Sequence, residues 1–134
     1  MATTTVALAG FAAWYIVLTL ALASYRVYVT VSTGKPVNSF APDGSDTPGI
    51  GRRLTRARDN CFETLPVFAA IAVAAHISSR VDVTNGLAMW VLYARIGQSV
   101  THIISTAPPA VLIRATLFTV QAVIYLAWSI RLLG

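Results

Sequence analysis

Four apolar segments, separated by polar connections, divide the chain. They lie at residues 6–31, 56–78, 84–105 and 109–132. At about 1.5 Å per residue, each segment is long enough to form a tilted helix across roughly 30 Å of hydrocarbon. The connection at residues 32–55 is rich in glycine and proline, whereas the two later connections are short turns. The pattern predicts an all-α fold: one multi-pass integral membrane domain over residues 1–134, built as a four-helix bundle.

Charged residues interrupt three of these segments. Only the first contains a long uncharged run, and the others reach spanning length only by including Glu63, Arg95 or Arg114. A charged side chain at the middle of the bilayer costs at least about 2.5 kcal/mol, so such residues normally face a bundle interior or a water-filled cavity. Each of these helices is therefore predicted to direct a charged residue into the bundle interior or into a water-filled cavity.

The composition excludes an ordinary soluble domain. Hydrophobic residues make up 56% of the chain and charged residues 11%, whereas about 25% of the residues in a soluble domain are charged. The net charge is +5, but no basic run with interleaved aromatic residues indicates nucleic-acid binding. Cys61 is the only cysteine, and His76 and His102 are far apart in the sequence. The chain has no CxxC, HxxxH or HExxH motif, so no metal site is expected.

Basic residues are distributed unevenly over the connections. The first connection and the start of the next helix contain Lys35, Arg52, Arg53, Arg56 and Arg58, whereas the opposite side has Arg80 and Arg131. Basic residues accumulate on the cytoplasmic side of membrane proteins. We therefore expect the first and third connections to be cytoplasmic and both termini to lie on the opposite side.

Polar side chains recur at helical spacing within three of the segments. Arg56, Asn60 and Glu63 lie at positions i, i+4 and i+7, so they share one helix face. Similar stripes on the third and fourth helices consist of Arg95, Gln98 and His102, and of Arg114, Phe118, Gln121 and Tyr125. Because polar side chains join helices in lipid, these faces are predicted to meet.

Glu63 and Arg95 carry opposite charges at comparable depth in the second and third helices. A neutralised pair is the least costly way to bury two such side chains, so we predict an ion pair between them. Arg56, Arg58 and Arg114 remain near the predicted cytoplasmic end. Such a cluster favours an anionic ligand held by hydrogen-bonded arginine contacts.

The same stretches resemble a known family. RARDNCFETLPVF, at residues 56–68, resembles the second-helix signature R-A-x-x-N-x-x-E-x-x-P-x-F of the MAPEG family, the membrane-associated proteins of eicosanoid and glutathione metabolism. ARIGQSVTHI, IRATLF and TGKP are similar to segments of the family's third, fourth and first helices. The resemblance covers essentially the whole chain and is to bacterial-type members similar to microsomal glutathione transferases.

The resemblance implies a left-handed four-helix protomer that assembles as a homotrimer in membrane lipid. It implies that glutathione, as co-substrate, binds between neighbouring subunits near the cytoplasmic side, and that a lipophilic electrophile reaches it from the bilayer. By position, Arg114 matches the catalytic arginine that stabilises the glutathione thiolate. The residues implied to bind the peptide or to line its site are Arg56, Arg58, Asn60, Glu63, Gln98 and His102.

Three functions remain open at this point. The first is a glutathione-dependent membrane transferase or peroxidase that acts on lipophilic electrophiles. The second is a non-catalytic MAPEG-like protein, either a lipid binder or a subunit of a larger membrane assembly. Phe118 and Ala115 stand where family enzymes commonly have tyrosine and serine, which favours the second function. The third is a site for a different anionic thiol or a lipid headgroup.

The predicted topology can be tested with single cysteines. In a chain with Cys61 replaced by alanine, Ser45→Cys is expected to be protected from an impermeant thiol reagent in intact cells, and Thr3→Cys is expected to react. Labelling of Ser45→Cys from outside the cell would reverse the orientation.

Overall fold

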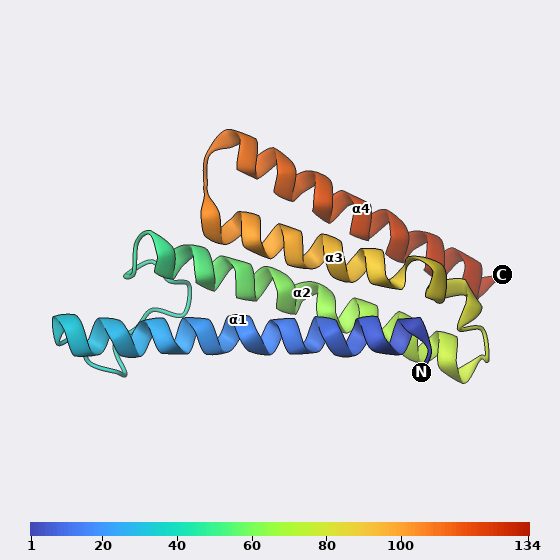
Figure 1. Ribbon diagram of the computed structural model, residues 1–134, viewed down its shortest axis with the longest axis horizontal. Helices are drawn as coiled ribbons and strands as arrows, with labels where there is room; N and C mark the ends of the chain where they lie inside the picture. The colour runs from blue at the N-terminus through green and yellow to red at the C-terminus, as the bar shows by residue number, and fades with distance from the viewer.

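The computed structural model describes residues 1–134 and contains four helices. They are α1 (Thr3–Thr33), α2 (Ile50–Ile77), α3 (Asp82–Ile104) and α4 (Pro108–Leu133). The helices run side by side, with both termini at one end of the bundle and the long loop and the α3–α4 turn at the other (Figure 1). α3 contacts all three other helices, whereas α1 and α4 do not touch. The predicted all-α fold is confirmed.

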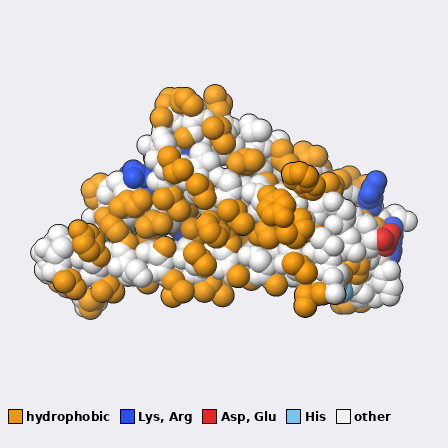
Figure 2. Space-filling model, in the orientation of Figure 1, with side chains coloured by type: hydrophobic (Ala, Val, Ile, Leu, Met, Phe, Trp, Pro, Cys, Tyr) orange, Lys and Arg blue, Asp and Glu red, His pale blue; other side chains and the backbone are white.

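The surface of the bundle is apolar and part of its interior is polar. α1, α2 and α4 are long and apolar enough to cross a membrane; α3 is not in this group. Four polar residues in the second half of α3, namely Arg95, Gln98, Ser99 and His102, are buried inside the protein. Hydrophobic side chains cover much of the visible face, and charged side chains lie mainly towards the ends (Figure 2). This distribution is that of an integral membrane protein.

The second helix begins earlier than the sequence predicted. α2 begins at Ile50 rather than at residue 56, so the connection is shorter than the predicted 32–55. Gly51, Leu54 and Thr55 are buried, while Arg52 is exposed. The first turns of α2 are therefore amphipathic. The hydropathy pattern missed them because Arg52 and Arg53 interrupt the apolar residues of this stretch.

The loop before α2 is held by its own polar contacts. Lys35 Nζ lies 3.0 Å from Asp46 Oδ2, and the same oxygen accepts the Ala41 N–H at 2.9 Å. The Ala41 N–H makes the largest contribution to holding the pKa of Asp46 below its ordinary value, and Lys35 adds to it. These contacts fold the loop back towards the start of α2.

Aromatic packing holds the half of the bundle near the termini. The ring of Phe68 on α2 lies 5.7 Å from Phe11, 6.0 Å from Tyr125 and 5.9 Å from Trp128, measured between centroids. At the same end, Thr4 Oγ1 of α1 forms a 2.6 Å hydrogen bond with Thr84 Oγ1 of α3. Packing and hydrogen bonds of this kind hold helices together where lipid weakens the hydrophobic driving force. In the other half of the bundle, buried polar residues link the helices instead.

Candidate functional site

A cavity of about 370 Å³ opens between α2, α3 and α4. α2 and α3 contribute polar side chains to it, and α4 contributes apolar ones beside a single arginine. Its lining residues are Asn60, Glu63, Gln98, His102, Val111, Arg114, Ala115 and Phe118. One wall is thus polar and charged, and the other is mostly apolar.

A second cavity of about 230 Å³ shares three residues with the first: Asn60, Glu63 and His102. Arg56 and Asp59 complete its lining. The helical spacing of Arg56, Asn60 and Glu63 explains why α2 presents all three to one side. The two cavities share these walls, and we call them together the polar groove.

The structure brings most of the predicted site residues together. Arg56, Asn60, Glu63, Gln98, His102 and Arg114 all line the polar groove. Arg58 does not. Its guanidinium donates to Asp59 Oδ1 at 2.6 and 2.9 Å, so its charge is already paired.

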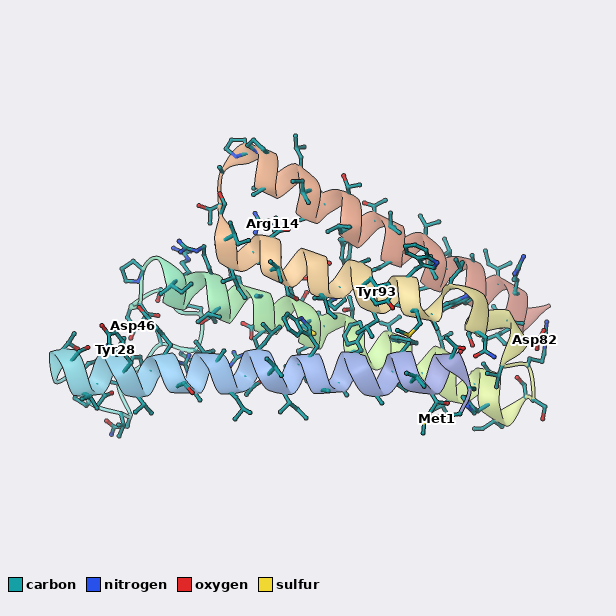
Figure 3. All side chains as sticks on the ribbon, in the orientation of Figure 1. Met1, Tyr28, Asp46, Asp82, Tyr93 and Arg114 are labelled. Atoms are coloured by element: carbon teal, nitrogen blue, oxygen red, sulfur yellow. The ribbon has the colours of Figure 1, made fainter.

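Arg114 reaches from α4 towards α3 (Figure 3). Its Nη1 lies 2.6 Å from His102 Nδ1. An arginine can only donate, so Nδ1 accepts and the ring proton of His102 is on Nε2. Arg114 Nε is buried without a partner. The histidine thus orients the guanidinium without neutralising it, and Arg114 remains a positive charge on the groove wall.

The predicted Glu63–Arg95 ion pair is wrong for this chain. The fully buried Arg95 donates from Nη1 to Asn60 Oδ1 and from Nη2 to Thr64 Oγ1, each at 2.7 Å. Glu63 is exposed, lines the groove and belongs to neither of the two ion pairs in the structure. Asn60 and Thr64 are one turn apart on the α2 face that meets α3. Glu63 lies beside that face rather than on it.

The hydrogen bonds of Arg95 belong to a chain that crosses three helices. Asn60 Oδ1 also accepts from Gln98 Nε2 at 3.0 Å, and Gln98 Oε1 accepts from Gln121 Nε2 at 2.9 Å. Asn60, predicted as a ligand contact on a polar face that meets other helices, therefore also holds the bundle together. Thr64 was not among the predicted residues, although its i+4 spacing from Asn60 places it on the same helix face.

The arrangement suits a small peptide with charges of both signs. Arg56 and Arg114 can bind carboxylate or thiolate groups, and Glu63 can bind an ammonium group. The Asn60 amide nitrogen donates no hydrogen bond within the chain, and this residue lines the groove. The polar groove can therefore hold a zwitterionic ligand against the apolar wall of α4.

We expect Asn60→Ala to lower the free energy of unfolding by about 2–4 kcal/mol, because it leaves buried donors of Arg95 and Gln98 without their acceptor. Glu63→Gln, on the same helix, is the control and is expected to change stability by less than about 0.5 kcal/mol. Chemical unfolding of the detergent-solubilised protein measures both.

Arg95→Gln combined with Asn60→Ala is expected to cost less than the sum of the single losses, because the two side chains share one interaction. If Glu63→Gln lowered the free energy of unfolding as much as Asn60→Ala does, the result would support an ion pair between Glu63 and Arg95 after all.

Comparison with known proteins identifies the family. The sequence model of the MAPEG family matches residues 4–134, which is essentially the whole chain. No curated protein and no solved structure matches the chain significantly. The family match and the apolar helical bundle agree with the resemblance of the second-helix signature, and the chain belongs to the MAPEG family.

Proposed function

We propose that the polar groove binds glutathione and that the protein is a membrane transferase or peroxidase acting on lipophilic electrophiles. The observation that carries the proposal is the two-sided groove. Its α2 side presents Arg56, Asn60 and Glu63, and its α4 side presents Val111 and Phe118 around Arg114. A polar thiol and an apolar electrophile could meet there.

The roles of the charged residues follow from their chemistry. Arg56 would bind a carboxylate of glutathione through a planar fork of donors, and Glu63 would bind its ammonium group. Arg114 would stabilise the thiolate, because a nearby guanidinium favours the charged form of a thiol. The thiolate sulfur would then donate its electron pair to the electrophilic carbon, whose leaving group departs with the bonding pair.

The apolar part of the groove would receive the second substrate. Val111, Ala115 and Phe118 line it, and Val111 and Phe118 are partly exposed on the outside of the bundle. A molecule dissolved in the bilayer could reach this wall without entering water. Positioning it against a bound thiolate would supply the rest of the rate increase.

The groove is open along the side of a single chain, and Glu63 is exposed. We propose that the protein forms a homotrimer in which a neighbouring subunit closes this opening. The membrane topology proposed with it has four spanning helices, the α1–α2 loop and the α3–α4 turn on the cytoplasmic side, and both termini opposite. Residues 1–134 would form one domain.

A non-catalytic role is the second candidate. Ala115 and Phe118 line the groove but offer no hydrogen-bond donor, and Arg114 is already bonded to His102. A protein that only binds lipid or a partner subunit needs no further donor at the sulfur position. Glutathione binding and thiol-dependent turnover distinguish the two candidates.

Glutathione is expected to raise the unfolding temperature of the purified protein in a saturable way. At about 100 times the dissociation constant, a ligand of the folded state stabilises it by about 2.7 kcal/mol. Arg56→Ala and Arg114→Ala are expected to lose the shift. Arg131→Ala, which removes an arginine from the opposite end of the bundle, is expected to retain it. No shift in the wild type at millimolar glutathione would favour the non-catalytic candidate.

The role of Arg114 predicts a pH profile. Turnover by the wild type is expected to level off near neutral pH, whereas Arg114→Ala should keep rising towards the pKa of a free thiol, about 8.5. At neutral pH its turnover should be roughly 10- to 100-fold lower, in line with loss of a charge that stabilises the thiolate. The turnover of Arg114→Lys, which keeps the charge, should lie between those of the wild type and Arg114→Ala at neutral pH. An unchanged profile in Arg114→Ala would remove Arg114 from the mechanism.

A further inference from the structure

A separate cavity lies where the start of α2 meets the α3–α4 turn. Its volume is about 370 Å³, and three of its six lining residues are arginines. The lining residues are Pro48, Gly49, Arg52, Arg53, Arg56 and Thr106. We call it the arginine cavity. Arg56 is the only residue that it shares with the polar groove.

The arginine cavity contains three positive charges and no acidic residue. The carboxylates nearby in the sequence are engaged elsewhere: Asp46 pairs with Lys35, and Asp59 with Arg58. Asp43 feels the charge of Arg52, but its hydrogen bond is with the Ser45 N–H, at 3.0 Å. None of them forms an ion pair with an arginine of the cavity, so the positive charge is left for a ligand.

Arg53 is held in place for such a ligand. Its Nε donates to the carbonyl oxygen of Ile103, in the last turn of α3, at 2.7 Å. This bond leaves both terminal nitrogens of the guanidinium without a partner in the chain. It also ties the start of α2 to the end of α3, so the position of the Arg53 guanidinium is fixed by a contact between two helices. A planar guanidinium fixed in this way suits two-point binding of a phosphate.

The position of the cavity indicates where the phosphate comes from. Ile104 and Leu112, on either side of the α3–α4 turn, are exposed apolar side chains. Basic side chains appear beside this apolar surface, at the end of the bundle that carries the turn (Figure 2). In a membrane, such a boundary between apolar and basic surface lies at the level of the lipid phosphates.

We infer that the arginine cavity binds the phosphate group of an anionic phospholipid. The lipid's phosphate would accept from Arg52 and Arg53, with the Thr106 hydroxyl as a further donor, and its acyl chains would lie against the exposed apolar side chains beside the turn. A zwitterionic phospholipid would bring its positive headgroup next to the three arginines of the cavity, so it is expected to bind more weakly than an anionic one. Binding of the lipid phosphate by Arg52 and Arg53 does not require glutathione, so its test is independent of the proposed function.

The test uses delipidated protein in detergent, with phosphatidylglycerol or phosphatidylcholine of the same acyl chains added to the micelles. Phosphatidylglycerol is expected to raise the unfolding temperature in a saturable way, and phosphatidylcholine is not. Arg52→Gln with Arg53→Gln should raise the half-saturating concentration of phosphatidylglycerol by roughly 25-fold, since each arginine near an anionic surface contributes roughly a five-fold change in affinity.

The matched control is Arg80→Gln with Arg131→Gln at the other end of the bundle. It removes the same charge, and Arg80 also donates to a helix carbonyl, that of Leu132, at 3.3 Å. This variant should respond to phosphatidylglycerol like the wild type. Equal weakening in both double variants would overturn the inference, because it would show a general charge effect.

Two further results would also overturn it. One is an equal response of the wild type to both lipids. The other is a saturable shift with inorganic phosphate, at matched ionic strength, that phosphatidylglycerol does not displace, because the ligand would then be a soluble phosphate. If the glutamine variant does not fold, Arg53→Lys keeps the charge but loses the planar fork, and it should still bind phosphatidylglycerol more weakly than the wild type.

Discussion

Arg95 places a permanent positive charge inside the bundle, with no carboxylate bonded to it. The charge is accommodated by two neutral oxygens, those of Asn60 and Thr64, and by the ring of Phe11, whose centroid is 5.5 Å away. These contacts come from α1 and α2, and the chain of amides through Gln98 extends them to α4. A buried guanidinium is costly unless its donors are satisfied. The relative rotation of the helices is therefore constrained around this side chain.

This constraint also leaves Glu63 available. Because neutral acceptors satisfy Arg95, the carboxylate of Glu63 remains in the polar groove without an ion pair. The same helix turn thus supplies a structural acceptor, Asn60, and a charged group for a ligand. His102 acts similarly for Arg114, since a neutral ring orients the guanidinium and preserves its charge. In both places, a neutral partner satisfies an arginine, and a charged group in the groove, Glu63 or Arg114, remains free for binding.

The arginines of the chain divide by depth and by partner. Arg95 is fully buried and structural, Arg56 and Arg114 line the groove, and Arg52 and Arg53 line the cavity at the start of α2. A count of basic residues cannot separate these roles. The family match supports a membrane protein related to glutathione and eicosanoid metabolism. The groove and the cavity suggest how one end of it could handle a polar ligand and a lipid headgroup separately.

The sequence by itself determined the class of the protein. Apolar length and low charge required a helical membrane bundle, the i, i+4 and i+7 spacing placed Arg56, Asn60 and Glu63 on one face, and the second-helix signature identified the family. Only the tertiary structure decided which side chains meet. In the structure, Arg95 bonds to Asn60 and Thr64 rather than to Glu63, Arg58 pairs with Asp59, and α2 begins at Ile50. The physical reason is that periodicity specifies the direction of a side chain around its own helix. The partner across the interface depends on the rotation and the axial shift of two packed helices, which no single segment encodes.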